Sequence, residues 1–225
     1  MIKIGITGQT GFVGTHLYNT LGLFPEEFER IDFRKEYFTD ENKLNEFVGQ
    51  CDVIVHLAAM NRHNDPQVIY NTNIGLVQKL IQSLEVTGSK AHVLFSSSTQ
   101  EERDNLYGKS KKEGRELMIH WANRVGGKFT GMIIPNVFGP FGHPNYNSVV
   151  ATFCHKLAHN ETPTIEVDGV EKTFGIINSI TSGFGGTLGS IEYDENKFIT
   201  KIHVCTDYVV KTYPDDVNEQ LQKFI

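Results

Sequence analysis

Cysteine is scarce in this chain, with three residues in a sequence of 225. Cys51, Cys154 and Cys205 lie far apart, and no pair has the CxxC spacing of a metal or redox motif. This scarcity excludes a disulfide-stabilised scaffold and a cysteine-rich zinc fold, and it favours a reduced, cytoplasmic protein. His155 and His159 are four residues apart, but no cysteine or acid with ligand spacing accompanies them, so we expect no metal site.

The chain also lacks an excess of positive charge and any long apolar run. It carries 21 Lys and Arg residues against 27 Asp and Glu residues, a formal net charge of -6, and the basic residues are scattered. Such a chain has no surface field for nucleic acid, so an anionic ligand must be held locally. Because no apolar run reaches the length of a membrane span and a candidate strand begins at once, we expect neither a transmembrane helix nor a signal peptide.

What the sequence does contain is a regular alternation of candidate strands and helices. Candidate strands cover 2–6, 28–33, 52–57, 91–95 and 129–134, and candidate helices cover 12–21, 41–48, 73–84 and 107–125. This order predicts an α/β fold with a Rossmann-like, doubly wound parallel sheet and right-handed crossovers. Ligands of such sheets bind at the carboxyl ends of the strands.

A glycine-rich turn follows the first candidate strand and precedes the first candidate helix. Glycine permits a tight turn and a close approach of the backbone to a pyrophosphate, while the start of the helix directs N–H groups at the phosphates. The turn therefore predicts a dinucleotide-binding site. Its residues are Gly8, Thr10, Gly11, Phe12, Val13 and Gly14.

The end of the second candidate strand carries two opposing signals about the cofactor. Asp32 lies eighteen residues beyond Gly14 and can accept hydrogen bonds from the ribose of NAD. Arg34 carries a planar guanidinium that suits the additional phosphate of NADP. We expect NADP(H), with NAD(H) as the alternative.

The composition changes after Pro135, where glycine, proline and asparagine crowd a loop. Beyond it we expect a helix over 148–159, strands near 165–167, 172–177 and 201–205, and a last helix over 215–224. We therefore expect a dinucleotide-binding domain over 1–143 and a small, divergent substrate-binding lobe over 144–225, intertwined with it in one structural unit. The glycine-rich segment 183–189 lacks a strand-to-helix frame and is expected to be a surface loop.

A tyrosine and a lysine at the start of the 107–125 helix form a candidate catalytic pair. Tyr107 and Lys111 are four residues apart, so their side chains project from one face of the helix. A nearby ammonium lowers the pKa of a tyrosine and lets it exchange a proton with a substrate oxygen. Ser98, at the end of the preceding strand, can donate a hydrogen bond to the same oxygen.

These motifs together resemble the short-chain dehydrogenase/reductase superfamily, in particular its extended branch, the NAD-dependent epimerase/dehydratase family, which acts on nucleotide sugars. The matching segments are TGQTGFVG at 7–14, HLAA at 56–59, FSSS at 95–98, YGKSK at 107–111 and PNVFGP at 135–140. The resemblance implies that the glycines hold the pyrophosphate and that Ser98, Tyr107 and Lys111 are catalytic, with Lys111 also binding the ribose. The cofactor lining that it implies consists of Leu57, Ala58, Ala59, Tyr107, Lys111 and Pro135.

A narrower likeness lies in NRH at 61–63, SSSTQ at 96–100 and PNYNSVVATFCHKLA at 144–158. These segments look like the reductase portion of capsular polysaccharide enzymes that reduce a UDP-linked 4-keto-6-deoxy-N-acetylhexosamine on the route to UDP-N-acetylfucosamine. The substrate contacts implied are Arg62, Ser98, Asn136, Asn145, Asn147 and Ser148. In those enzymes a metal-binding cupin domain follows, and its epimerase activity is not carried over. The branch often dimerises through its long helices, so we expect a homodimer.

The chain departs from the family pattern in two places. Ile133 and Ile134 stand where the family usually has an arginine, and Asn178 and Ser179 stand where acids are usual. The second departure falls in the substrate-binding lobe, so the sequence specifies the identity of the substrate less closely than it specifies cofactor binding.

The leading hypothesis is an NADPH-dependent reductase of a nucleotide-activated 4-keto sugar in surface polysaccharide synthesis. A nucleotide-sugar 4-epimerase with retained NAD would use the same residues without net consumption of cofactor. A 4,6-dehydratase is disfavoured, because Thr99 and Gln100 replace the acidic pair expected after the catalytic serine. A non-catalytic dinucleotide-binding sensor or scaffold is the alternative from another class, and a degenerate reductase that depends on a partner is a third.

Overall fold

The computed structural model describes residues 1–162, 171–174, 191–193 and 199–205, with side chains described up to residue 162. The chain forms two compact units, Met1–Pro135 and Asn136–Ile225. The division falls at the start of the loop rich in glycine and proline, ahead of the boundary expected at residue 143.

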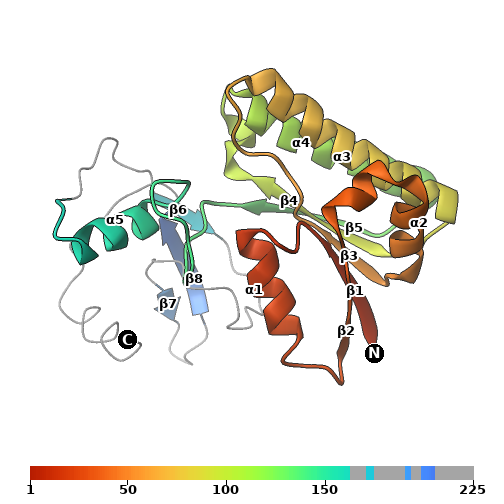
Figure 1. Ribbon diagram of the computed structural model, residues 1–225, viewed down its shortest axis with the longest axis horizontal. Coiled ribbons are helices and arrows are strands. Elements are labelled where there is room, and N and C mark those ends of the chain that lie inside the picture. Colours follow the sequence, from red (N-terminus) through yellow and green to blue (C-terminus); the bar gives the residue numbers. More distant parts are fainter. Residues whose placement is uncertain (163–170, 175–190, 194–198, 206–225) are drawn as a thin grey trace. The chain divides into compact units, whose positions relative to one another are not determined.

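A five-stranded parallel sheet organises the first unit (Figure 1). Its strands are β1 (Ile2–Thr7), β2 (Phe28–Ile31), β3 (Val53–His56), β4 (His92–Ser98) and β5 (Phe129–Ile134), in the spatial order β2-β1-β3-β4-β5. The register pairs Ile4 with Val53, and Val53 with His92. The chain changes direction across the sheet between β1 and β3, and such a switch point opens a ligand crevice at the carboxyl ends of the strands. The predicted doubly wound parallel sheet is confirmed.

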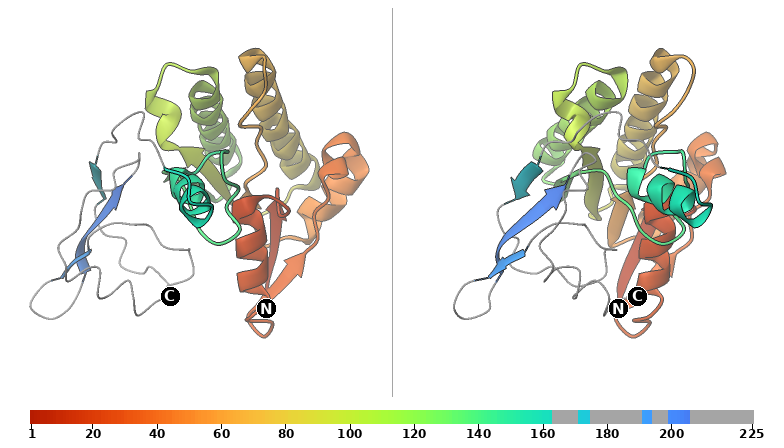
Figure 2. Two further views of the ribbon diagram at one scale, coloured as in Figure 1. Left: turned by 60° about the vertical axis from the view of Figure 1, so that its left-hand side comes forward. Right: turned by 90° about the vertical axis from the view of Figure 1, so that its left-hand side faces the viewer.

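Helices cover both faces of this sheet. They are α1 (Phe12–Leu21), α2 (Glu41–Gln50), α3 (Pro66–Thr87) and α4 (Leu106–Val125), with the short 3₁₀ helices η1 (Lys35–Thr39) and η2 (Thr99–Glu102). On one face α2, α3 and α4 enclose a buried cluster that includes Phe47, Leu80 and Met118. On the other face α1 packs against Ile6 and Val55. Figures 1 and 2 show α3 and α4 side by side along this unit.

α3 begins earlier than predicted because polar residues form its first turns. It begins at Pro66, rather than at residue 73, since proline suits the first helical position and Asp65 caps the helix by accepting the Gln67 N–H at 2.8 Å. Apolar periodicity does not detect these polar first turns. β4 ends at Ser98, as expected, and Ser98 pairs with Ile134 of β5.

The second unit contains α5 (Val149–Ala158) and a separate antiparallel sheet. The strands of that sheet are β6 (Glu171–Phe174), β7 (Ile191–Tyr193) and β8 (Ile199–Cys205), in the order β6-β8-β7. α5 lies within the predicted helix, and Ser148 caps it by accepting the Ala151 N–H at 3.1 Å. β6 and β8 overlap predicted strands, whereas the three-residue β7 was not predicted. The features expected at 165–167, 183–189 and 215–224, with Asn178 and Ser179, lie outside the described residues.

Candidate active site

The glycine turn lies at the carboxyl end of β1 and leads directly into α1. Gly8 has a φ of 79°, in the left-handed region that favours glycine, and a Cβ there would lie 2.9 Å from the Ala58 backbone nitrogen. A Cβ on Gly14 would lie 2.1 Å from the Gly8 carbonyl oxygen. The turn, the loop after β3 and the start of α1 therefore approach each other too closely for any side chain between them.

The first turn of α1 is formed without a capping side chain. Gly11 is the N-cap residue and makes no side-chain cap, and no acid stands in the first turn. A helix start of this kind presents backbone N–H groups and the positive end of the helix dipole, both of which suit a phosphate. Thr10 is exposed here, and Phe12 and Val13 are partly buried. The residues present thus fit the pyrophosphate of a dinucleotide.

The next part of the site is the end of β3 and the loop after it. Thr7 is fully buried, its Oγ1 lies 2.8 Å from His56 Nδ1, and it accepts a hydrogen bond from the Ala58 N–H at 3.3 Å. Thr7 therefore ties Leu57 and Ala58 to β1 beside the glycine turn, while Ala59 is exposed. Burial lowers the pKa of His56 to about 3, so this ring is neutral and packs in the core.

Asn73 of α3, whose role the helical pattern did not predict, joins this loop to α4. Its buried amide accepts the Met60 N–H at 2.7 Å and donates to the Met60 carbonyl and to Ser110 Oγ, each at 3.0 Å. The Ser110 hydroxyl in turn donates to the Tyr107 carbonyl at 2.7 Å. An asparagine among the apolar positions of a helix is the signal that identifies such a residue, because buried amides need partners.

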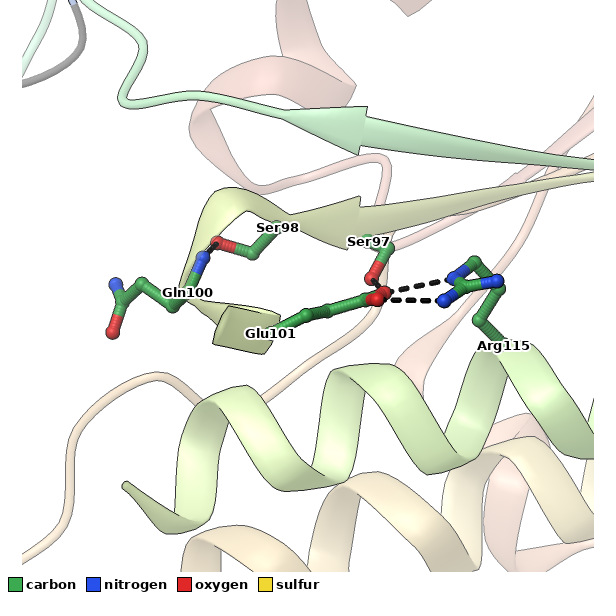
Figure 3. Close-up of polar contacts among 5 residues, drawn as sticks. All are labelled: Ser97, Ser98, Gln100, Glu101 and Arg115. Carbon is green, nitrogen blue, oxygen red and sulfur yellow. Dashed lines mark hydrogen bonds and ion pairs between the residues drawn. The ribbon is translucent and has the colours of Figure 1, made fainter. Parts of the chain in front are cut away.

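The predicted catalytic residues lie where β4 passes into α4. Ser98 ends β4 and caps η2 by accepting the Gln100 N–H at 3.2 Å (Figure 3). Tyr107 and Lys111 lie one turn apart at the start of α4. The Ser98 side chain lies close enough to the Tyr107 phenol to lower its pKa. The structure therefore brings the serine and the tyrosine together at the carboxyl end of the sheet.

Burial governs the proton affinities at this point. Burial raises the pKa of Tyr107, and the nearby Ser98 side chain acts in the opposite direction. The Lys111 side chain is 3% exposed, and its ammonium lies 4.6 Å from the centre of the Phe95 ring. Burial lowers the pKa of Lys111 to about 8, against the opposing charge of Glu101.

The expectation of a lowered tyrosine pKa is therefore wrong for this structure. Desolvation of the phenol is the largest influence on Tyr107, and the group that favours its phenolate is Ser98 rather than Lys111. The helical spacing predicts that the tyrosine and the lysine share a face, but it does not predict how deeply either is buried.

Asp32 and Arg34 follow β2, and both are exposed. The Tyr18 hydroxyl of α1 donates to the Asp32 carboxylate at 2.8 Å. Between the two charged residues, the Phe33 N–H donates to Gln9 Oε1 at 3.1 Å, which joins this strand end to the glycine turn. Asp32 thus already accepts a hydrogen bond from within the chain.

The other predicted contacts lie elsewhere in the chain. Arg62 is exposed in the loop after β3, and Pro135 directly follows β5. The predicted substrate contacts Asn136, Asn145, Asn147 and Ser148 belong to the second unit, in the loop before α5 and at its cap, and are not among the residues that the first unit brings together.

In the described part of the chain, no group of three His, Cys, Asp or Glu residues is placed to hold a metal ion. Nor does a helix in those ranges have both the length and the apolar character needed to cross a membrane.

Comparison with known protein sequences gives matches over most of the chain. Residues 4–173 match the model of the NAD dependent epimerase/dehydratase family. The chain is 33% identical over 187 residues to the UDP-2-acetamido-2,6-beta-L-arabino-hexul-4-ose reductase of Pseudomonas aeruginosa, a match that covers 81% of this chain and 48% of that protein. Overall, the chain spans about half the length of the curated relatives it matches.

Solved structures with a similar fold agree with the sequence matches. CapF from Staphylococcus aureus, a capsular polysaccharide assembling protein, matches with a TM-score of 0.59 and 27% identity, over 90% of this chain and 54% of that chain. RMD from Pseudomonas aeruginosa, solved with NADPH, has a TM-score of 0.63 at 21% identity, over 71% of this chain and 61% of its own, which shows the fold alone. Because the family model matches well over half of its length, the chain belongs to the NAD dependent epimerase/dehydratase family.

Proposed function

We propose that the chain acts as an NAD(P)H-dependent reductase of a nucleotide-activated 4-keto-6-deoxy sugar, of the UDP-N-acetylhexosamine type, in the synthesis of a surface polysaccharide precursor. The observation that carries the proposal is the placement of Ser98, at the end of β4, close to Tyr107 and one helical turn from the buried Lys111, at the carboxyl edge of the sheet that bears the glycine turn. The names of the Pseudomonas aeruginosa reductase and of CapF support it.

Each group in this site has a task in such a reduction. The glycine turn and the start of α1 would bind the pyrophosphate of the cofactor. When bound, the reduced nicotinamide supplies the hydride that the carbonyl carbon at C4 accepts. Tyr107 donates its phenolic proton to the resulting alkoxide, and Ser98 donates a hydrogen bond to the same oxygen. Lys111 would bind the ribose and stabilise the phenolate that is left.

The raised pKa of Tyr107 suits this direction of reaction. Burial keeps the phenol protonated at neutral pH, so a proton is available when the alkoxide forms. The opposite reaction, oxidation of a sugar alcohol, needs the phenolate as base, which burial disfavours. The protonated phenol is therefore the form of Tyr107 that reduction of a ketone requires.

We propose NADP(H) as the preferred cofactor. Asp32, the residue suited to the ribose of NAD, already accepts the Tyr18 hydroxyl at 2.8 Å. Arg34 stands two residues further along and is exposed to solvent. A guanidinium matches the geometry and the charge of a phosphate, so this strand end suits NADP(H) better than NAD(H).

We also propose a homodimer formed through α3 and α4. A surface groove between these two helices is lined by Ile81, Leu117 and Trp121 and by the charged Glu85 and Arg124. A second copy can place the same helices across it about a twofold axis. Light scattering coupled to gel filtration tests this, and Leu117→Glu is expected to yield monomers.

A 4-epimerase with retained cofactor is the second candidate, and the site residues alone would serve both. The relatives named as 4-epimerases, from Escherichia coli O157:H7 and Arabidopsis thaliana, are 25% and 27% identical to this chain. The distinction between the two activities is the fate of the cofactor.

The deciding experiment mixes the purified chain with NADPH or NADH and a UDP-4-keto-6-deoxy-N-acetylhexosamine, and follows the absorbance of the reduced nicotinamide. A reductase consumes cofactor in step with the 4-keto sugar reduced, whereas an epimerase, given a UDP-N-acetylhexosamine in a parallel reaction, inverts its C4 hydroxyl with no net consumption of cofactor. Calorimetric titration with each dinucleotide comes first. Binding without any turnover would favour a sensor or scaffold, and binding of neither dinucleotide by folded protein would overturn the proposal.

A further inference from the structure

A largely buried ion pair fastens the serine-bearing turn to α4 (Figure 3). The Glu101 carboxylate accepts hydrogen bonds from Arg115 Nε at 2.9 Å and from Arg115 Nη2 at 2.7 Å. The Ser97 hydroxyl donates to the same carboxylate. The side chain of Glu101 is 8% exposed and that of Arg115 is 24% exposed. Two parallel bonds to one guanidinium fix the orientation of the partners as well as their separation.

The ion pair is joined through η2 to the proposed catalytic serine. Glu101 belongs to η2, the 3₁₀ helix whose first N–H groups Ser98 caps. This turn rests on the first turn of α4, since a Cβ on Gly108 would lie 2.0 Å from the Gln100 carbonyl oxygen. Two contacts therefore hold η2 against α4. The Gln100 backbone packs on Gly108, and the Glu101 carboxylate binds Arg115.

Arg115 shares a face of α4 with the proposed catalytic residues. Tyr107, Lys111 and Arg115 follow one another at intervals of four residues, so they form one stripe along the helix. Ser98 contacts the tyrosine at the start of this stripe, and Glu101 binds the arginine at its end. The contact between Glu101 and Arg115, two helical turns beyond Tyr107, thus helps to fix the position of Ser98 relative to Tyr107.

The negative charge of Glu101 also acts on Lys111, the middle residue of this stripe. Although burial raises the pKa of Glu101, the hydrogen bonds from Arg115 and Ser97 outweigh it, so the pKa is lowered and the carboxylate stays ionised. That negative charge raises the pKa of Lys111 against the larger effect of burial. Loss of the carboxylate would therefore alter both the geometry at Ser98 and the charge of Lys111.

We infer that Glu101 and Arg115 are positioning residues for the proposed reduction, which hold the Ser98 hydroxyl at Tyr107 through two bonds between η2 and α4. The inference rests on the proposed function and adds residues that act through others rather than on the substrate. A merely structural pair would change stability alone, whereas a positioning pair changes the rate of the folded enzyme at unchanged substrate affinity.

The test compares Glu101→Gln and Arg115→Met with Asp104→Asn as the matched control. Asp104 precedes α4 and also pairs with a cation of that helix, Lys109 at 2.5 Å, but its side chain is 91% exposed. Misplacement of a catalytic group by about 1 Å costs roughly 100-fold, so we expect kcat to fall by about 10–100-fold in both variants. KM for NADPH and for the sugar nucleotide should stay within about twofold of wild type. The control should match wild type.

Two further variants keep the test decisive. Arg115→Lys keeps the charge but loses the two parallel N–H donors of the guanidinium, and its kcat should lie between those of Arg115→Met and wild type. The double variant Glu101→Gln with Arg115→Met should be no slower than either single variant, because the pair acts as one unit. If Arg115→Met does not fold, Ser97→Ala removes one bond to the carboxylate and leaves the ion pair formed; it should lower kcat less than Glu101→Gln.

The outcomes separate this inference from the proposed function. If the wild type is active and Glu101→Gln has the same kcat as the control Asp104→Asn, the inference is overturned and the proposed function still stands. A rise in KM at unchanged kcat would overturn it as well, since the pair would then act on binding. A folded wild type that binds NADPH and turns over no 4-keto sugar would overturn the proposed function, and the inference with it.

Discussion

The candidate site has a buried end and an exposed end within the first unit. Where β4 passes into α4, Lys111 is 3% exposed and burial changes the pKa of both Tyr107 and Lys111. Where β2 ends, Asp32 and Arg34 are exposed to solvent. Charges withdrawn from water interact strongly, while exposed charges are screened by water and salt. The buried end therefore suits proton transfer, and the exposed end suits recognition of the cofactor.

The largest expected effect lies at the buried end. Tyr107→Phe removes the proton donor and keeps the ring, so kcat should fall by about 1,000-fold, within the range for general acid catalysis. NADPH affinity should change by less than about twofold, because the ring still fills its place. Steady-state kinetics and calorimetry measure the two quantities.

Tyr70→Phe is the matched control for this change. The Tyr70 hydroxyl also bonds a residue of α4, Glu113, but takes no part in the proposed reaction. Its loss should leave kcat near the wild-type value. Turnover retained by the Tyr107 variant would show that the buried end does not carry the chemistry.

The glycine turn follows β1, and a side chain there should weaken cofactor binding. At Gly14 a Cβ would meet the Gly8 carbonyl oxygen at 2.1 Å, and backbone cannot move aside without opening the turn. Overpacking of this kind costs about 2–3 kcal/mol, so Gly14→Ala should weaken NADPH binding by roughly 100-fold. Gly49→Ala is the control, since nothing lies within 4 Å of its added Cβ. Equal affinity in the two variants would contradict the proposed phosphate site.

The sequence predicts those parts of the site that depend on neighbours along the chain. A glycine turn between strand and helix, and two side chains one helical turn apart, are local patterns. Asn73 and Met60 are bonded across thirteen residues, and Glu101 meets Arg115 across fourteen, so these contacts depend on how helices and loops pack. The error about Tyr107 has the same origin, because burial of its phenol is a property of the packed fold.

Melting temperatures measured over a range of pH distinguish the buried charge of Lys111 from an exposed lysine charge. Below about pH 8 Lys111 is charged in the folded and in the unfolded chain, and its burial destabilises the fold. Between about 8 and the ordinary lysine pKa of 10.5 the folded protein releases this proton first, so the unfolded state binds more protons and the destabilisation fades as pH rises.

Lys111→Met should therefore melt above wild type at neutral pH by about 2–4 °C, the shift that accompanies ~1 kcal/mol in a domain of this size. The difference should shrink as pH rises through this window. Only the difference between the two proteins is informative, because the pKa of Cys51, raised to about 12 by burial, favours unfolding at alkaline pH in both. Lys109→Met, whose lysine side chain is 56% exposed, should show no such trend. A difference independent of pH would mean that Lys111 is not buried as a charged group.

The smallest effects are expected at the exposed end, where they decide which cofactor is preferred. Arg34→Ala should weaken NADPH binding by about tenfold and leave NADH nearly unchanged, because one charge-assisted contact to a phosphate is lost. Tyr18→Phe frees the Asp32 carboxylate from its 2.8 Å hydrogen bond and should improve NADH binding by about two- to threefold. Calorimetry at two salt concentrations measures both, and the arginine effect should be smaller at high salt because exposed charges are screened. An unchanged ratio of NADPH to NADH affinity in Arg34→Ala would remove the basis for the NADP(H) preference. A loss of NADPH affinity that does not depend on salt would mean that this end of the site closes around the cofactor and becomes as buried as the other.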